Sequence, residues 1–381
     1  MGRGSKHRPV PVAIIRKYAI IIQDRNSVKR QKMKTELVKI EGQQNREELL
    51  ERAGQIIKEG GLVAFPTETV YGLGGDALNP DSSRKIYAAK GRPSDNPLIV
   101  HICCMEDLPR LVRHVPESAV KLAEKFWPGP LTMILEKSPE VPRETTGGLE
   151  TVAIRMPDHP VALDFIRASG GYIAAPSANS SGKPSPTLAK YVAEDLDGKI
   201  EMILDGGQVG IGLESTIVDL TEDMPVILRP GYITQGMLEE VLGQVDMDKT
   251  ILSADSGQAP KAPGMKYRHY APKGDLTIIE GTIGKVTDYI NARTEELIKQ
   301  GEKVGIIATD ATLGAYSAGC VKSAGDRKNE ATIARELYRI LREFDDEEVT
   351  VIFSESFEQK GIGQAIMNRL LKAAGHKVIH V

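Results

Sequence analysis

The chain of 381 residues contains three cysteines and one tryptophan. Cys103, Cys104 and Cys320 are too few for a disulfide framework, and no CxxC pair is present. We therefore expect a reducing compartment, the cytoplasm. No apolar run reaches the roughly 20 residues that a membrane helix requires, so we expect no membrane partner.

The chain also lacks an excess of one charge. Its 49 Lys and Arg and 52 Asp and Glu give a net charge of −3. The whole chain therefore has no basic footprint for nucleic acid, and any weak contact with tRNA or other RNA would need a local basic patch. The length suits two domains better than one typical core.

The common nucleotide and hydrolase motifs are missing. There is no GxxxxGK[ST] and no GxSxG motif. Ser180–Lys183 resembles the end of a phosphate-binding loop, but Pro184 follows it. The glycines at 207, 210 and 212 have the wrong order for a dinucleotide fingerprint. An ATP site in this chain must therefore use an uncommon arrangement.

A metal site is considered where His101 lies near Cys103 and Cys104. The segment LIVHICC has the pattern of a buried strand, and the ligand spacing typical of zinc is absent. We favour the strand and predict no ion held by a protein cage.

Apolar periodicity predicts an α/β domain in the first part of the chain. The first helix follows Asn45 as its cap, has an apolar face from Leu49 to Ile57, and ends at Gly60. Predicted strands follow at 62–65, 98–102, 131–135, 151–155, 172–175, 201–204, 215–220 and 226–228. Predicted helices lie at 82–89, 118–126, 160–168 and 186–192. Alternation of the two kinds indicates a mixed sheet with helices.

The remaining chain divides into three further parts. Residues 234–274 have little periodic hydrophobicity and several Pro and Gly, which predicts an ordered linker. Strands at 276–280, 304–309, 349–354 and 377–381 alternate with three helices, as in a Rossmann-like unit. Residues 1–32 are basic, and Met33 opens a segment suited to a natural start, so we expect a disordered extension or a misassigned start. The predicted domains are 1–32, 35–233, 234–274 and 275–381.

Polar and cationic side chains follow several predicted strands, where ligands bind in open α/β sheets. Thr67–Tyr71 follow the first strand, although a plain turn fits this segment too. Lys90 and Arg92 end a helix and suit a triphosphate, although cations that offset a helix dipole fit equally well. His101 lies within a strand, where a structural role is more common.

Three later segments add similar groups. Arg155 ends a strand and suits a carboxylate. The loop after residue 175 offers Ser177, Asn179 and Ser185, although a simple Asn- and Ser-rich turn is equally open. The segments 214–216 and 228–231 add hydroxyls and a further cation. Since neither a catalytic triad nor a carboxylate-rich cage is evident, the pattern favours positioning and charge neutralisation of two anionic substrates.

Eight segments carry a resemblance to a known family. They are PTETVYGLG, KGRPSDNPLIVHI, WPGPLT, TVAIRMPDHP, APSANSSGKPSPT, ESTIVDL, LRPG and APGMKYRHYAP, in this order. Residues 35–381 resemble the L-threonylcarbamoyladenylate synthases, YrdC-like proteins, in their long two-domain form. The resemblance implies a YrdC-like open twisted mixed sheet and a smaller Rossmann-like C-terminal domain.

The resemblance implies a nucleotidyltransferase. From L-threonine, bicarbonate or CO2, and ATP with Mg²⁺, such an enzyme makes threonylcarbamoyl-AMP and pyrophosphate. A downstream transferase complex then modifies the adenosine beside the anticodon of certain tRNAs. Mg²⁺ is expected on phosphate oxygens and water rather than in a protein cage.

The resemblance also assigns site residues. Its threonine pocket corresponds to Thr69, His101, Arg155, Ala175 and Ser215. Its ATP site corresponds to Lys90, Arg92, Asn96, Thr151, Ser177, Ser185, Arg229 and His269. Lys90 and Arg92 are the expected catalytic pair, because they would neutralise phosphate charge. The linker is expected to run over the active site, with His269 and Tyr270 covering the nucleotide.

Two other functions stay open at this point. YrdC-like domains present a concave, locally basic surface, so a double-stranded RNA-binding module without catalysis is one alternative. Hydrogenase-maturation proteins that transfer carbamoyl groups also contain such a domain, but the acylphosphatase and zinc-finger-like segments that accompany it are missing here. Threonine-dependent release of pyrophosphate would separate a synthase from an RNA-binding module.

Overall fold

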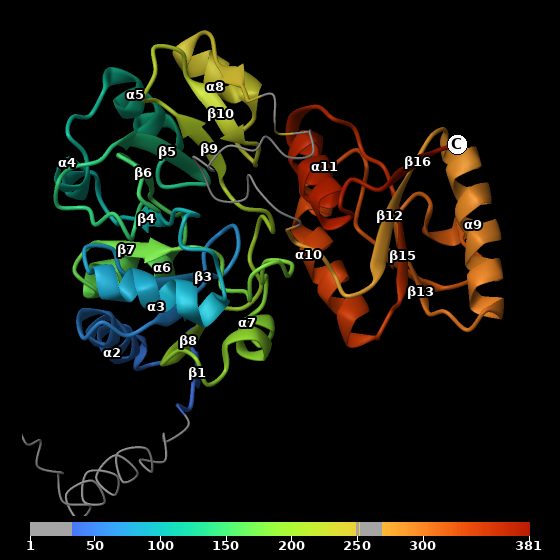
Figure 1. Ribbon diagram of the computed structural model, residues 1–381, viewed down its shortest axis with the longest axis horizontal. Helices are drawn as coiled ribbons and strands as arrows, with labels where there is room; N and C mark the ends of the chain where they lie inside the picture. Colours follow the sequence, from blue (N-terminus) through green and yellow to red (C-terminus); the bar gives the residue numbers. More distant parts are fainter. Residues whose placement is uncertain (1–32, 249–250, 252–268) are drawn as a thin grey trace, which may run out of the picture. The chain divides into compact units, whose positions relative to one another are not determined.

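The computed structural model describes residues 33–248, 251 and 269–381 (Figure 1). The predicted extension 1–32 and most of the predicted lid, residues 252–268, lie outside the described residues. Among the described helices, none has the length and apolarity needed to cross a bilayer.

Eleven strands form one mixed sheet, which confirms the predicted α/β class. Their order is β1 (Glu36–Lys39), β8 (Met202–Asp205), β2 (Val63–Phe65), β3 (Gly72–Asp76), β7 (Ile173–Ala175), β4 (Ile99–His101), β6 (Thr151–Arg155), β5 (Leu131–Glu136), β9 (Thr216–Asp219), β10 (Val226–Arg229) and β11 (Asp246–Met247). Parallel and antiparallel pairs alternate irregularly along the sheet, as in β4 with β6 and β4 with β7.

Both faces of this sheet are apolar because side chains alternate along each strand. In β2, Val63 and Phe65 pack on one face, whereas Ala64 packs on the other. The first face is covered by α2 (Arg46–Lys58) and α6 (Pro160–Ala168). The second face carries α3 (Pro80–Lys90), α5 (Glu117–Phe126), α7 (Ala189–Leu196) and α8 (Gln235–Leu242), with η1 (Met105–Asp107) and α4 (Leu108–Leu111) nearby in sequence.

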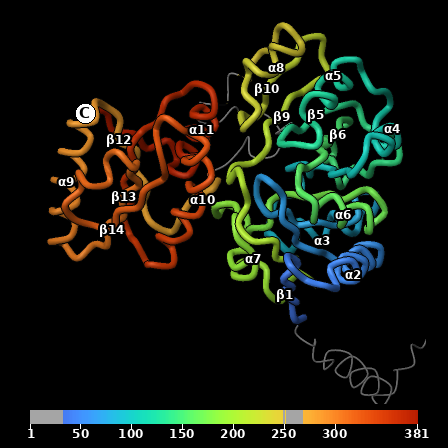
Figure 2. The backbone as a smooth tube through the Cα atoms, turned by 180° about the vertical axis from the view of Figure 1, so that it is seen from behind, coloured from blue at the N-terminus to red at the C-terminus, as the bar shows by residue number. Residues whose placement is uncertain are grey.

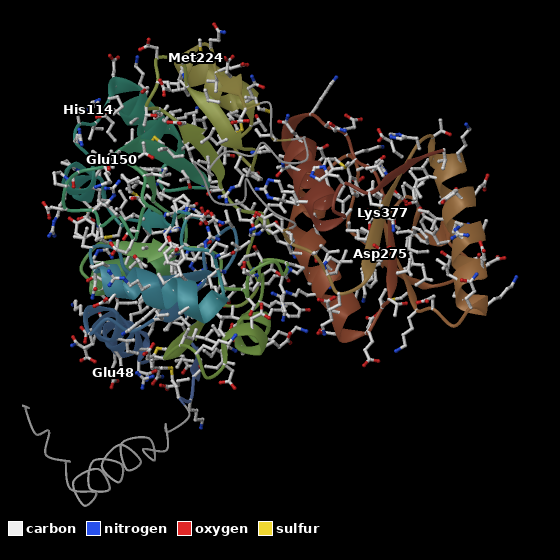
Figure 3. The ribbon with its side chains drawn as sticks, viewed as in Figure 1. Glu48, His114, Glu150, Met224, Asp275 and Lys377 are labelled. Carbon is white, nitrogen blue, oxygen red and sulfur yellow. The ribbon has the colours of Figure 1, made fainter. Side chains whose placement is uncertain are left out.

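Five parallel strands form the second sheet. Their order is β14 (Cys320–Ser323), β13 (Val304–Ala308), β15 (Val351–Glu355), β12 (Asp275–Glu280) and β16 (Val378–His380). Helix α9 (Ile283–Lys299) covers one face, and α10 (Glu330–Asp346) and α11 (Gly361–Ala373) cover the other (Figures 1 and 2). A short η3 (Leu313–Ala315) follows β13. Asp275 and Lys377, labelled in Figure 3, form an exposed ion pair beside β12 and β16.

Several sequence predictions need correction. Part of the expected linker 234–274 folds as α8 and β11, and β11 extends the first sheet. The helix expected at 186–192 begins at Ala189 instead, with Leu188 at its N-cap position. The strands β3 and β14 were not predicted at all. Asn45 occupies the N-cap of α2, but its side chain makes no capping hydrogen bond.

Strand register brings the candidate site residues together. His101 at the end of β4 pairs with Arg155 at the end of β6. On the other side of β4, Ile99 pairs with Ala175 at the end of β7. These three strands therefore place the ring of His101, the guanidinium of Arg155 and the start of the loop after Ala175 within one small region of the sheet.

Candidate active site

A cavity lies at this region of the first sheet. Of the residues predicted for the site, it is lined by Arg92, His101, Arg155, Ala175, Ser177, Ser215, Arg229 and His269. Five predicted residues are outside this lining, namely Thr69, Lys90, Asn96, Thr151 and Ser185. The ends of β4 and β6 and the loops after β2 and β7 thus contribute residues to one cavity.

Arg155 and Glu68 form a buried ion pair at the threonine side of the predicted site. Arg155 Nη2 lies 2.7 Å from Glu68 Oε1, and their side chains are 5% and 12% exposed. Both carboxylate oxygens of Glu68, and Nε and Nη2 of Arg155, nevertheless lack a well-aligned hydrogen bond. Since buried polar groups are normally satisfied, this free capacity suits a polar ligand.

The neighbouring hydroxyls are ordered by one another. Thr67 Oγ1 donates to the carbonyl of Val70 at 2.6 Å, and lies 2.9 Å from Thr69 Oγ1. Thr67 lines the cavity, so Thr69 stands directly behind it. The structure therefore places Thr69 one hydrogen bond away from the cavity lining.

His101 is held as a neutral ring. Its Nδ1 lies 3.1 Å from the carbonyl of Ile99, which accepts, so the proton belongs on Nδ1 and Nε2 is left as an acceptor. Burial, with the charge of Arg155, lowers the pKa of His101 to about 3. A neutral ring of this kind is suited to accept a hydrogen bond from a substrate hydroxyl.

Ser215, in the cavity lining, is hydrogen-bonded to Thr132 and to Arg229. Its Oγ lies 2.7 Å from Thr132 Oγ1, and it accepts from Arg229 Nη2 at 3.1 Å. Arg229 Nε also donates to the carbonyl of Ser215 at 3.0 Å. The guanidinium of Arg229 is thereby oriented at the end of β10, with its pKa lowered by burial.

Arg92 supplies a second cation to the cavity. Its Nε and Nη2 donate to the carbonyls of Asn96 and Pro97 at 3.3 and 3.1 Å. Burial lowers the pKa of Arg92 to about 10, so it stays charged at neutral pH. The buried amide oxygen Oδ1 of Asn96 has no hydrogen-bond partner, which leaves it free for a ligand.

Lys90 lies behind the cavity lining, and its predicted role at the phosphates stays a prediction. Its ammonium is buried and donates to the carbonyls of Ser177 and Asn179, and to Asn179 Oδ1 at 3.2 Å. Burial, with the charge of Arg92, lowers the pKa of Lys90. In this arrangement Lys90 fixes the loop after β7, and through it the hydroxyl of Ser177.

Ser185 and Glu214 are bound to each other at the far end of the same loop. Ser185 Oγ donates to Glu214 Oε1 at 2.6 Å. Glu214 also accepts from Tyr338 and from Arg369, both in the second domain. Ser185 therefore borders the cavity through Glu214, which does line it.

The end of the linker reaches the cavity. His269 and Tyr270 are both buried and line it, with ring centroids 5.2 Å apart. Burial, with the charges of Arg92 and Lys90, lowers the pKa of His269 to about 3. His269 is therefore a neutral ring beside cationic groups.

Thr151 lies at the opposite end of β6 from Arg155. The four steps along the strand between them span roughly 13 Å, at about 3.3 Å per residue. The assignment of Thr151 to the ATP site therefore stays a prediction.

Sequence reasoning assigned no individual role to three residues that the structure places here, namely Thr67, Glu68 and Glu214. Glu68 stands between two threonines in a segment already suspected of binding, and its charge was the available signal. Glu214 has a partner in the second domain 155 positions along the chain, and no local pattern indicates that pairing.

The cysteines form a separate group. Cys103 and Cys104 lie beyond the end of β4, and their sulfur atoms and an oxygen of Asp107 lie within 4.8 Å of one another. The observed strand β4, Ile99–His101, is therefore shorter than the segment LIVHICC that was predicted to be a strand. His101 does not join this group, because its ring faces the cavity.

Comparison with known proteins gives consistent relationships. Residues 55–231 match a family model described as telomere recombination, and residues 233–375 match one described as threonylcarbamoyl-AMP synthase, C-terminal domain. Proteins named threonylcarbamoyl-AMP synthase are 53% identical in Bacillus subtilis and 51% in Pyrococcus abyssi, over 86% of this chain and 93% and 95% of theirs. A crystal structure of P. abyssi Sua5 complexed with L-threonine superposes with a TM-score of 0.85 at 48% identity, covering 91% of this chain and 99% of the other.

Proposed function

Because the chain belongs to the threonylcarbamoyl-AMP synthase family, we propose that it makes threonylcarbamoyl-AMP from L-threonine, bicarbonate or CO2, and ATP, releasing pyrophosphate. The observation that carries this proposal is the single cavity in which Arg155 and His101 meet Arg92, Ser177 and Arg229. Relatives at 51–53% identity that carry the synthase name support catalysis over the RNA-binding alternative. The product would feed a transferase that modifies tRNA.

The proposed threonine side uses Arg155, His101 and Ser215. Arg155 binds the substrate carboxylate, and its Nε atom, which has no hydrogen-bond partner, is consistent with this role. Neutral His101 accepts from the threonine hydroxyl through Nε2. That a solved relative was crystallised with L-threonine supports threonine as the amino acid.

The proposed reaction has two bond-forming steps. The threonine nitrogen attacks the carbon of CO2 and loses a proton, which gives a carbamate. A carbamate oxygen then attacks the α-phosphorus of ATP, and the bond from this phosphorus to the pyrophosphate oxygen breaks. Arg92 and Arg229 stabilise the charge that develops on the phosphates, so positioning and electrostatics carry the catalysis.

We propose that Mg²⁺ enters with ATP as part of the substrate. The carboxylate in the cavity lining, Glu214, is already engaged by Ser185, Tyr338 and Arg369. A carboxylate so occupied is a poor ligand for a further cation. Phosphate oxygens and water therefore hold the ion.

The test is release of pyrophosphate by the purified chain in the presence of ATP, Mg²⁺, bicarbonate and L-threonine. We expect release that requires threonine, and incorporation of labelled bicarbonate into a nucleotide product. Release without threonine would contradict the reaction. No release, together with RNA affinity that falls steeply with salt, would favour the RNA-binding module.

A further inference from the structure

Two buried arginines of the second domain bind carboxylates of the first. Arg369 Nε in α11 lies 2.9 Å from Glu214 Oε2, and Arg342 Nη2 in α10 lies 2.7 Å from Asp195 Oδ2. All four side chains are nearly inaccessible to solvent. Since burying charges costs much of what their attraction returns, stability alone is a weak reason for such pairs.

Arg342 holds the loop between Ser177 and Ser185. Its Nε and Nη2 both donate to the carbonyl of Pro184, at 3.0 and 2.6 Å. Its partner Asp195 accepts from the backbone N–H of Ser180 at 3.0 Å and from Lys183 Nζ at 2.7 Å. The second domain thus fastens this loop directly and through Asp195.

Arg369 and Tyr338 hold Ser185, the residue after Pro184, through Glu214. Tyr338 donates to Glu214 Oε2 at 3.0 Å, and Glu214 Oε1 accepts from Ser185 at 2.6 Å. Burial on its own raises the pKa of Glu214, but Arg369 and Arg229 together lower it to about 2. Glu214 is therefore a fixed anion between a second-domain cation and a cavity cation.

Close backbone packing accompanies these pairs. Gly212 has a φ of +83°, and a Cβ atom there would lie 2.5 Å from the Cα of Arg335 in α10. Val70 and Leu213 of the first domain belong to the same buried apolar cluster as Leu337 in α10. The loops beside the cavity consequently cannot shift without moving α10.

We propose that Arg342 and Arg369 are positioning residues that fix Ser177, Ser185 and Glu214 for ATP, so that the second domain completes the nucleotide half of the site. This inference rests on the proposed function for the identity of the ligand. The threonine half is carried by β4 and β6, so loss of these arginines weakens ATP binding selectively.

The test replaces Arg342 by Met, which keeps much of the aliphatic stem and removes the fork. We expect the KM for ATP and the Kd for an α,β-methylene analogue of ATP to rise about tenfold, which corresponds to about 1.4 kcal/mol, because the loop that carries Ser177 and Ser185 is no longer held in place. The KM for threonine should change less than twofold. A purely structural role would move both constants or only the melting temperature.

Lys190→Met provides a matched control. Lys190 Nζ lies 3.3 Å from Asp346 Oδ2 in an exposed pair that also joins α7 to α10. Such pairs contribute little, so both KM values and the melting temperature should match the parent. Arg342→Lys serves if the Met variant does not fold, because it keeps a cation but cannot reproduce the fork. It should show an intermediate loss of ATP affinity.

The outcomes separate this inference from the proposed function. An unchanged KM for ATP in a folded Arg342 variant overturns the inference alone, and so does an equal rise for threonine and ATP. A parent chain that binds the analogue but releases no pyrophosphate contradicts the proposed reaction, whereas analogue binding by the variants still decides the positioning role. A parent chain that binds no analogue overturns both.

Discussion

Arg155 Nη2 at the end of β6 lies 2.7 Å from Glu68 Oε1 in the loop after β2, and Arg155 lines the cavity. The pair keeps a cation buried without filling its hydrogen-bonding capacity. A substrate carboxylate can therefore join the guanidinium while Glu68 still balances part of its charge.

Replacing Arg155 by Ala should raise the KM for threonine at least tenfold, because about 1.4 kcal/mol or more of charge-assisted binding is lost. The KM for ATP should change far less. Steady-state kinetics with each substrate varied in turn would measure both. Arg143→Ala is a suitable control, since Arg143 is exposed and pairs only loosely with Glu150 at 3.3 Å. Equal losses for both substrates would contradict the pocket assignment.

Replacing Lys90 by Met should lower turnover roughly 100-fold, because the carbonyls of Ser177 and Asn179 would lose their buried cation and the loop its position. Lys85→Met tests the same helix at an exposed position, where Lys85 Nζ donates to the carbonyl of Gly60 at 2.6 Å. That control should retain full turnover. A Lys90 variant with normal turnover would remove this residue from the mechanism.

The free energy of unfolding should decrease as the pH falls from about 6.5 to about 3. This window is set by His101 and His269, whose pKa values burial lowers from 6.5 to about 3. Between these values the unfolded chain binds a proton on each ring that the folded chain does not. The free energy of unfolding therefore falls by up to about 1.4 kcal/mol per ring for each unit by which the pH is lowered. Urea unfolding at pH 7 and pH 5 should show a smaller difference for His269→Gln. His114→Gln, at an exposed ring, should keep the parental pH dependence.

Replacing Gly212 by Ala should destabilise the chain by at least about 1–2 kcal/mol, the cost of a left-handed residue, with a further loss from the clash against α10. Gly210→Ala is the matched control, because the nearest atom to a Cβ there would be the carbonyl oxygen of Glu68, at 3.8 Å. Thermal unfolding would compare the two. Equal melting temperatures would argue against close packing at Gly212.

Removal of residues 1–32 should leave turnover and melting temperature unchanged. The first described strand, β1, begins at Glu36, and the matches to family models begin at residue 55. Kinetics of residues 33–381 against the full chain would check this. An inactive truncation would give the extension a role that its composition does not suggest.

Sequence patterns predicted the elements whose burial is periodic. Helix α6 was predicted with its observed bounds, because Pro160 opens it and its apolar face is continuous. Strand β3 was missed because three of its five residues are glycines, which carry no apolar signal. Close packing explains why a side chain is absent at one of these glycines, since a Cβ on Gly74 would lie 2.8 Å from a methyl carbon of Ile173.

The candidate site was predictable to a similar degree. Residues at strand ends, such as Arg155 and Arg229, could be anticipated because position and charge coincide. The use of Lys90 as a support for backbone carbonyls was not predictable, since the same residue type and position suit a phosphate. Long-range pairs such as Glu214 with Arg369 depend on how two domains meet, which no local window records.

One family model ends at residue 231 and the other begins at residue 233, but this point is not a domain boundary in the structure. Helix α8 and strand β11 belong to the first sheet although they follow that point, and Glu214 keeps its counter-ion on the other side of it. A truncated chain that ends between the two family models would lack the edge strand of its first sheet. It would also leave the buried carboxylate of Glu214 without its counter-ion. For this chain, the smallest transplantable catalyst is expected to include both halves.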